Sequence, residues 1–438
     1  MKTVFLNVSL ICLFVAVFAA VTAFSQPGAI DSTFGIGGSV VTSPPAVLMT
    51  HTVSKDMVIQ SDGKVVVLSR TMDVNNAYSG VLTRFTADGS IDASFGIGGF
   101  AYLTWGAPNH CIPSKVAIQI VNGEERFVVV GSGGCGGTGY VRVERFTQWG
   151  APDTTFGTGG VTTINAIWFP QNFSIAIQND QKILLAGGAN PMVRLKANGT
   201  ADTTFGPNGI SRTNAGITIM KTAALWNGKI VAAGYAWNGS NYDFAAVRFN
   251  SNSSLDTSFG TRGKTLVDFA GLNDIGFDMK VDSAGKIIVS GKAADTSVVP
   301  DGSQRGALIR LKSDGKRDTT FGTNGRSALL QSSIALYFVT VQSNGKIVAS
   351  GPSMPTVSAG DVLTARYNSN GSLDSGYDGD GWNTFDFYGS EESIANGLIQ
   401  NDPGCGCAKL VVGGNTWTEP YTGVYDNPRY IFGLRFNL

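Results

Sequence analysis

The sequence contains very little of several residue types on which enzymes and nucleic-acid-binding proteins depend. Only 2 of its 438 residues are histidine, His51 and His110. A Ser-His-Asp triad needs a histidine and a histidine-rich metal site needs several, so the sequence offers few candidates for either. Charged residues make up 15% of the chain, as 32 basic and 32 acidic residues without a run of either sign. This balance argues against a nucleic-acid partner and against an anionic membrane surface.

The sequence also lacks a long apolar run that would span a membrane. Its N-terminus has one early lysine, Lys2, a mostly apolar run from Leu10 to Ala20, and small residues up to Ser25. The pattern predicts a signal peptide over residues 1–25 and a mature chain over 26–438 that is secreted, periplasmic or at the cell surface. A retained membrane anchor is the weaker alternative, because polar residues at positions 7 and 9 leave the run short of the roughly 18 to 20 apolar residues of a spanning helix.

Cysteine is scarce, with five residues, one of which lies in the predicted signal peptide. The four others form an even number in an exported chain, which permits disulfides. We predict a bond between Cys111 and Cys135, which flank adjacent antiparallel strands at one rim. We expect a second, small ring between Cys405 and Cys407 at one hairpin tip, with free thiols as the alternative.

Glycine and phenylalanine are abundant, with 57 and 25 residues, and both recur in a short sequence motif, called here the phrase, that occurs seven times. Its fullest form is Asp92-Ala93-Ser94-Phe95-Gly96-Ile97-Gly98-Gly99. The phrases begin at Asp31, Asp92, Asp153, Asp202, Asp256, Asp318 and Asp374, and the aromatic residue three positions later is Phe34, Phe95, Phe156, Phe205, Phe259, Phe321 or Tyr377. A residue repeated in every unit belongs to the architecture of the unit and does not mark one unique site.

Between the phrases the sequence predicts short strands. In the first unit these are residues 39–42, 53–60, 64–69 and 80–86, with an Asp62-Gly63 turn between the second and third. Asp-Gly or Asn-Gly between two apolar runs is a strong hairpin signal, because the tight turn requires positive φ. A lysine follows this turn in five units, as in Lys64, and we expect it to be solvated as it leaves the hairpin.

An arginine precedes the phrase aspartate by eight positions in each of the six places where one repeat runs into the next. The pairs are Arg84 with Asp92, Arg145 with Asp153, Arg194 with Asp202, Arg248 with Asp256, Arg310 with Asp318, and Arg366 with Asp374. A fixed spacing across a turn indicates that the two side chains meet, or that each caps a neighbouring backbone group, and we interpret both as structural.

Four antiparallel strands in each of seven units predict an all-β fold, a seven-bladed β-propeller in a single domain over residues 26–438. The chain ends predict how the ring closes. Residues 84–87 run directly into residues 88–92, which lead to the next phrase. The equivalent residues 435–438 end the chain, and the equivalent of residues 88–92 lies at the N-terminus, in residues 27–31. Leu438 therefore corresponds to Ala87, and Pro27 corresponds to Asp88. We therefore expect the N-terminal segment to complete the turn of the last blade, with Asp31 beside Arg435, and to leave no unpaired edge.

These motifs also resemble a known family. The phrase D-x-T-F-G-x-x-G, with an I-Q-x-D-G-K-I-V-like hairpin upstream of each Arg-Phe, is similar to the delta-60 repeat of secreted bacterial proteins, a domain of unknown function taken to form propellers. The resemblance covers about residues 27–438, with local departures at Tyr377 and in the hairpin at 401–407. It implies the propeller fold and little about activity, since the family is defined by its repeat.

Sequence motifs for catalysis are weak. Asp374, Asp378 and Asp380 are close in sequence, but Trp382 occupies the next ligand position of a calcium loop and no glutamate closes it. Glu391, Glu392 and Glu419 are the only candidates for a glycosidase carboxylate pair in the loops of one blade. We therefore expect no catalytic residue, no metal and no cofactor.

The unrepeated aromatic and polar residues gather in the irregular loops, which a four-stranded blade places on one rim. We predict a ligand-binding surface there, because exposed Trp, Tyr and Arg anchor ligands and partners. Its candidate residues are Trp105, His110, Trp168, Trp237, Tyr242, Trp417, Tyr421, Tyr425 and Arg429. The expected function is that of a monomeric, non-catalytic binding or scaffold propeller for an unknown carbohydrate or protein. A carbohydrate hydrolase or lyase with its site in these loops is the alternative.

Overall fold

The structure is a computed structural model, and the part of it described below covers most of the chain after residue 25. The described residues are 26–27, 29–42, 49–73, 78–104, 112–133, 140–165, 173–189, 191–211, 213–224, 227–294, 304–327, 330, 335–356, 359–386, 392–401, 407–417 and 429–438.

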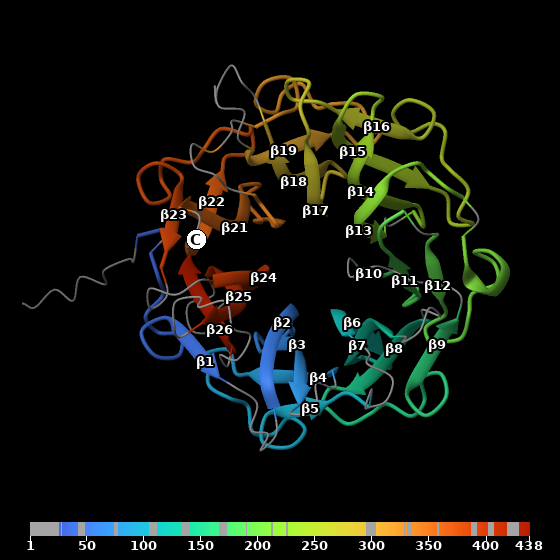
Figure 1. Cartoon of the computed structure of the whole chain (residues 1–438), viewed down its shortest axis with the longest axis vertical. Coiled ribbons are helices and arrows are strands. Elements are labelled where there is room, and N and C mark those ends of the chain that lie inside the picture. The colour runs from blue at the N-terminus through green and yellow to red at the C-terminus, as the bar shows by residue number, and fades with distance from the viewer. Residues whose placement is uncertain are drawn as a thin grey trace, which may run out of the picture.

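Seven antiparallel sheets stand around a common axis, as Figure 1 shows in a view down that axis. The innermost strands of five of them line a cavity, called here the central channel. Each sheet is one blade of a propeller, numbered here by its place in the chain. In chain order the strands are, for blade 1, β2 (Met49–Ile59), β3 (Val65–Asp73), β4 (Tyr78–Phe85) and β5 (Phe100–Tyr102); for blade 2, β6 (Ile112–Val121), β7 (Glu124–Gly133), β8 (Tyr140–Thr147) and β9 (Val161–Asn165); for blade 3, β10 (Ser174–Ile177), β11 (Ile183–Ala186) and β12 (Val193–Leu195); for blade 4, β13 (Thr218–Ala224), β14 (Ile230–Trp237), β15 (Tyr242–Phe249) and β16 (Lys264–Val267); for blade 5, β17 (Ile275–Val281), β18 (Ile287–Ala293) and β19 (Arg305–Leu311); for blade 6, β20 (Phe338–Val341), β21 (Ile347–Thr356), β22 (Ala359–Tyr367) and β23 (Trp382–Phe385); and for blade 7, β24 (Glu392–Asn401), β25 (Ala408–Trp417), β26 (Arg429–Asn437) and β1 (Ser39–Thr42).

The predicted fold class is confirmed, with one local variation. In blades 3 and 5 the outermost strand is reduced to single bridges, Val193 with Ile210 and Ile309 with Arg326. The only helical element among the described residues is a 3₁₀ turn at Pro207–Gly209, beside the reduced edge of blade 3. No described helix has the length and apolarity to cross a bilayer.

The structural blade is offset by one strand from the repeat unit expected from the sequence. The short stretch after each phrase is the outermost strand of the same blade that precedes the phrase, not the first strand of the next blade. Thus β5 follows the phrase at Asp92 and pairs with β4, as in the register of Val81 with Tyr102. The phrase therefore turns the chain inside a blade, and the irregular segment after it leads to the next blade.

This offset explains how the ring closes. The first strand of the chain, β1, is the outermost strand of blade 7 and pairs with β26 from Ser39 opposite Leu434 to Thr42 opposite Ile431. The N–H of Asp378 donates to the carbonyl of Pro27 at 3.0 Å, as the N–H of Gly35 donates to that of Asp88 at 2.7 Å. Pro27 thus occupies the position of Asp88, and the predicted closure is confirmed.

Tight packing between neighbouring sheets holds the blades together. Each cluster of buried side chains takes residues from two adjacent blades, and five of the seven phrase aromatics lie within them. Phe95 of blade 1, for example, meets Phe127 of blade 2 edge to face, with ring centroids 5.7 Å apart. Because every sheet is covered on both faces, its strands contain continuous apolar runs, such as residues 127–130 of β7, all of them 0% exposed.

Candidate functional site

The repeated Arg and Asp side chains meet in all seven blades. In each pair the guanidinium Nε of the arginine lies 2.5 to 2.9 Å from a carboxylate oxygen of the phrase aspartate. The seventh pair, Arg435 with Asp31 at 2.8 Å, lies at the seam, the place in blade 7 where the two ends of the chain meet. Each arginine also lies over the aromatic ring of its phrase, as Arg84 does over Phe95 with 4.6 Å from Cζ to the centroid. The predicted contact across the turn is confirmed.

A third charged residue joins each pair, and here the expectation of solvated lysines was wrong. The cation after each hairpin turn reaches the same carboxylate: Lys64 lies 3.4 Å from Asp92, and Lys229 lies 2.5 Å from Asp256. The other five cations are Arg126, Lys182, Lys286, Lys346 and Lys409. The phrase aspartate thereby ties the hairpin turn to the rest of its blade.

The arginine also reaches the following blade. Nη1 of Arg84 donates to the carbonyl of Gln148 at 2.6 Å, and the same bond recurs from Arg145, Arg194 and Arg435 at 2.7 to 2.9 Å. The whole group, here called the blade clasp, therefore joins one phrase, one hairpin and the next blade. Its side chains are engaged in these contacts, so we assign it to architecture and not to ligand binding.

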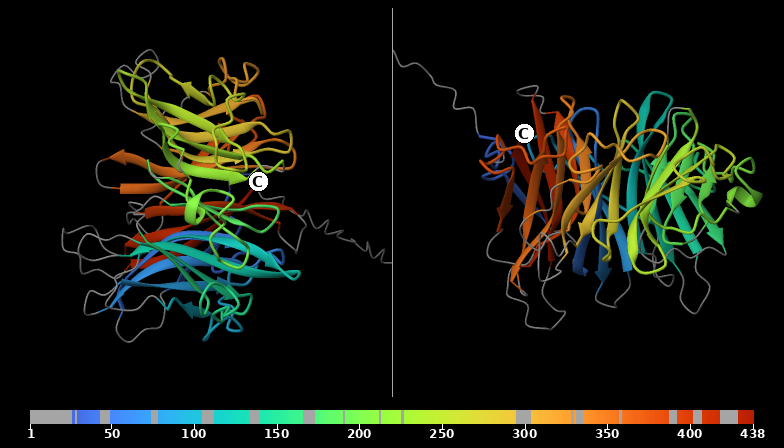
Figure 2. Two further views of the ribbon diagram at one scale, coloured as in Figure 1. Left: turned by 90° about the vertical axis from the view of Figure 1, so that its right-hand side faces the viewer. Right: turned by 90° about the horizontal axis from the view of Figure 1, so that it is seen from above.

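The strand order places the two kinds of connection on opposite rims, which Figure 2 shows in side view. The hairpin rim carries the phrases and the turns between the first two strands of each blade, such as residues 60–64. The loop rim carries the connections between the second and third strands and those between blades. It is the rim on which the sequence predicts ligand binding.

Most of the predicted binding residues lie outside the part of the chain that the structure describes with side chains. Trp105, His110, Trp168, Tyr421 and Tyr425 lie outside the described residues, and for Trp417 and Arg429 only the backbone is described. That backbone pairs the two in register at the loop-rim ends of β25 and β26. Trp237 and Tyr242 are described with their side chains, and the structure brings these two together.

Trp237 and Tyr242 form an aromatic patch with Tyr235 on the loop rim of blade 4. Trp237 ends β14 directly opposite Tyr242 at the start of β15. The ring centroids of Trp237 and Tyr242 are 5.2 Å apart and those of Tyr235 and Tyr242 are 5.4 Å apart, both edge to face. Trp237 is 56% exposed and Tyr242 is 39% exposed, so the rings offer accessible faces to solvent.

Polar side chains fix the turn that presents the patch. Asn238 donates from Nδ2 to Oδ1 of Asn241 at 2.6 Å and to Oδ1 of Asp243 at 2.9 Å, while its own Oδ1 accepts the N–H of Ser240 and of Asn241. The next blade adds a bond from the N–H of Tyr242 to Oδ1 of Asn273 at 3.0 Å. The aromatic pair is thus held in place before any ligand arrives.

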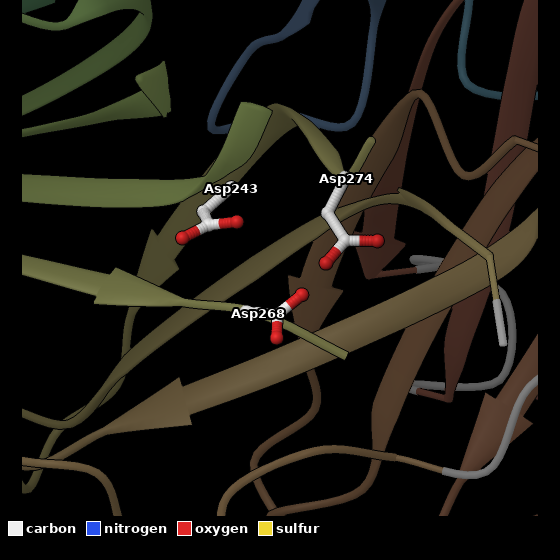
Figure 3. Close-up of side chains that lie close together, drawn as sticks. All are labelled: Asp243, Asp268 and Asp274. Carbon is white, nitrogen blue, oxygen red and sulfur yellow. The ribbon is translucent and has the colours of Figure 1, made fainter. Parts of the chain in front are cut away.

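Beside the patch, three carboxyl groups converge that the sequence did not suggest as a site. Asp243 is the second residue of β15, Asp268 follows β16, and Asp274 precedes β17, and Figure 3 shows their side chains turned toward one another. One oxygen from each lies within 4.8 Å of the others. Asp243 is 25 positions from Asp268, and the three belong to no motif, so no sequence signal marks them.

Backbone N–H groups donate to the most deeply buried member of this carboxyl cluster. Asp274 is fully buried and accepts the N–H groups of Phe269 at 2.8 Å and Ala294 at 3.3 Å. Burial, reinforced by the nearby charge of Asp268, raises the pKa of Asp274 to about 7. Oxygen atoms suit a calcium ion, but backbone N–H groups already donate to Asp274 and the side-chain amide of Asn238 donates to Asp243, so we do not assign a metal to the cluster.

Other sequence-based candidates have structural explanations or lie outside the described residues. Asp374, the first carboxylate of the discounted calcium motif, belongs to the blade clasp with Arg366 and Lys346. The side chains of Glu391, Glu392 and Glu419 are not described. The same holds for Cys111, Cys135 and Cys405, so both disulfides remain predictions.

The fold and the repeated clasp define the class of the protein, a seven-bladed β-propeller built from one repeat. Five segments, residues 60–95, 178–205, 227–259, 285–321 and 342–377, match the family described as the domain of unknown function (DUF5122) beta-propeller. The chain is therefore a delta-60 repeat propeller, a member of a family whose function is not known.

Solved structures similar to this chain include proteins of different functions. A protein of unknown function from Dyadobacter fermentans has 9% identity, covers 92% of this chain and 100% of its own, and gives a TM-score of 0.39. The polysaccharide lyase Uly1 has 11% identity, coverage of 88% and 90%, and a TM-score of 0.44. Sqt1 from Chaetomium thermophilum has 10% identity, coverage of 90% and 97%, and a TM-score of 0.44. No curated protein matches the sequence.

Proposed function

We propose that this protein is a non-catalytic, extracytoplasmic binding propeller that recognises carbohydrate on its loop rim. The observation that carries the proposal is the aromatic patch, with Trp237 and Tyr242 exposed and touching at the end of one hairpin. An aromatic ring offers an apolar face for a sugar ring, and its polar tip stays hydrated. The exposed side chain of Asn273 adds a polar group beside the same surface.

The rigidity of the turn supports this function. Two aromatic side chains have few rotatable bonds, and the Asn238 hydrogen bonds fix the backbone that presents them. Binding to a preorganised surface loses less conformational entropy than binding to a mobile loop. The signal peptide predicted over residues 1–25 supports placing the ligand outside the cytoplasm, and we propose a monomer because the ring closes on itself.

The described carboxyl groups offer little support for the hydrolase alternative. A general acid must lie within hydrogen-bond reach of the bond that it protonates. Asp274 has a suitably raised pKa, yet it is fully buried and bonded to two backbone N–H groups. We therefore place the aromatic patch, and not the carboxyl cluster, at the centre of the function.

The test is a glycan array and a cell-wall polysaccharide pull-down with residues 26–438, which contain every described strand. Trp237→Ala should weaken binding by about tenfold or more, the range of an aromatic anchor at an interface. Trp149→Ala is the matched control, because Trp149 is equally exposed, at 57%, in a turn on the hairpin rim. If binding of a ligand depended on Trp149 and not on Trp237, the binding surface would lie on the hairpin rim and the proposed loop-rim site would be refuted. Binding of no glycan would refute the carbohydrate class.

A further inference from the structure

The central channel contains one equivalent position in each of the seven innermost strands. In five strands the pairing shifts at a β-bulge, and the next paired residue is Asp56, Lys115, Lys221, Asp278 or Asn396. Bonds between blades place Ser174 and Phe338 at the same level. In each case a side-chain oxygen accepts the N–H of the residue that follows the equivalent position in the next blade. Asp56 accepts from Val116, which follows Lys115. Ser174 accepts from Thr222, which follows Lys221, and Asp278 accepts from Val339, which follows Phe338. These seven residues are called the channel ring.

The two carboxylates of the channel ring already have hydrogen-bond donors. Asp56 accepts the N–H of Val116 at 3.0 Å and the side-chain amide of Asn396 at 2.6 Å. Asp278 accepts the N–H of Val339 at 3.0 Å. Both residues are less than 10% exposed, at 5% and 9%. Their charges are therefore stabilised mostly by the protein and do not depend on the lysines alone.

The two lysines, by contrast, each have one carboxylate partner within the described part of the chain. Lys115 lies 3.6 Å from Asp56, and Lys221 lies 3.1 Å from Asp278. An ammonium group has three donors, so one acceptor each leaves capacity on both lysines. Asp278 and, across the channel, Asp56 both favour the charged form of Lys221 and raise its pKa. The unfilled hydrogen-bonding capacity of the channel ring is thus cationic.

The lysines and an aliphatic wall line the same cavity. It has a volume of about 340 Å³; its polar lining residues are Asp56, Lys115, Ser174, Lys221 and Asn396, and its other walls include Val58, Ile118, Ile175, Ile177 and Leu398. These apolar side chains come from blades 1, 2, 3 and 7 and are partly exposed. A volume near 300 Å³ is at the lower end for small-molecule sites. It holds a chain of on the order of ten carbons, taking roughly 30 Å³, the share of one water molecule in the liquid, for each.

We propose that the central channel binds an amphiphilic carboxylate, a medium-chain fatty acid, with its head group on Lys115 and Lys221 and its hydrocarbon chain between β2, β6, β10 and β24. Charge complementarity selects the head group, because carboxylate oxygens accept the unused ammonium donors. Apolar burial selects the tail. This site is separate from the carbohydrate surface on the loop rim of blade 4.

Isothermal titration with decanoate tests the proposal on residues 26–438. Decanoate should bind saturably with a stoichiometry of one. Decanol, which lacks the charge, and butyrate, which lacks the chain, should each bind at least about tenfold more weakly, which is a clear difference in the equilibrium constant. Absence of saturable decanoate binding, or equal binding of decanol, would overturn the proposal.

Variants separate the two halves of the site. The pair Lys221→Met with Asp278→Asn removes one head-group contact without leaving an unpaired charge, and Ile177→Phe fills the apolar part without touching the lysines. Each should lower decanoate affinity about tenfold, while Lys316→Met, at a lysine whose side chain is 75% exposed, should not. Circular dichroism checks that each variant is folded. If the Lys221→Met and Asp278→Asn double variant does not fold, the affinity of the Ile177→Phe variant alone decides whether the ligand occupies this cavity. Unchanged affinity in a folded Ile177→Phe variant would refute a ligand in this cavity.

Discussion

Replacing Asp31 by asparagine tests how strongly the blade clasp closes the ring. In the seam clasp Asp31 lies 2.8 Å from Nε of Arg435 and 3.2 Å from Nζ of Lys409, with side chains 3 to 10% exposed. Asparagine keeps the volume and the acceptor for Thr33 but removes the charge. Breaking one partner of a buried ion pair costs about 3 to 5 kcal/mol, because the other charge stays buried without compensation.

The corresponding change in melting temperature is modest because the ring is large. With about 2.1 cal/mol/K of unfolding entropy per residue, the 438 residues give roughly 0.9 kcal/mol/K. A loss of about 3 to 5 kcal/mol then lowers the melting temperature by roughly 3 to 6 °C, if the ring unfolds as one unit. Urea unfolding followed by circular dichroism measures the free energy directly.

Glu124→Gln is the matched control for this measurement. Its ion pair with Arg126 is equally short, at 2.7 Å, but the glutamate side chain is 52% exposed. Exposed pairs contribute about 0 to 1 kcal/mol, so this change should have little effect. If Asp31→Asn and Glu124→Gln lowered the free energy of unfolding by the same amount, the seam clasp would not be a main source of closure.

Three further predictions follow from the same contacts. A circular permutant that joins Leu438 directly to Pro27, with new ends between residues 87 and 88, should keep the wild-type melting temperature within a few degrees, because the seam bonds match those of an internal join; loss of folding would contradict the register. Burial alone would raise the pKa of Asp202, but the Thr204 hydrogen bond and the charge of Arg194 outweigh it and lower the pKa to about 2. Its folded pKa lies below the unfolded value, so its stabilisation is present above about pH 4 and is lost as the pH falls toward 2, which urea midpoints should show, with a shallower slope in Asp202→Asn. Asp274 has the opposite sign: its raised pKa of about 7 means that stability declines as the pH rises from about 4 to 7, and Asp274→Asn should remove that decline in the same titration.

The sequence predicted the clasp where its contacts are local. Arg84 and Asp92 are separated by one turn, so a spacing that recurs in every join was enough to infer that they meet. Lys64 reaches the same carboxylate from 28 positions away, and no local pattern reveals a contact that exists only after the hairpin has folded back. A lysine after a turn is usually solvated, and here the general rule gave the wrong answer.

The strand order was harder to predict than the strand count. A tight turn identifies two neighbours, as at residues 60–64, but the outermost strand pairs across the whole phrase. A short stretch such as β5 contains no signal for the side on which it pairs. The same limit applies to the carboxyl cluster, because Asp243, Asp268 and Asp274 meet only when blades 4 and 5 are in place. Of the predicted aromatic residues, Trp237 and Tyr242 were found together, but their role in binding remains a prediction.

Comparison of equivalent positions among the blades distinguishes architecture from function in this repeat protein. The clasp has the same Arg and Asp in all seven blades and the same contacts, which is what a structural role requires. The channel ring is also one position repeated seven times, yet its residues are Asp, Lys, Ser, Lys, Asp, Phe and Asn. At Asp56, Ser174 and Asp278 a side-chain oxygen accepts a backbone N–H of the next blade, although the residue type differs. Because closure of the ring does not require a particular residue there, the charges of Lys115 and Lys221 are free to serve a ligand, and the same reasoning favours the unrepeated Trp237 over any residue of the clasp.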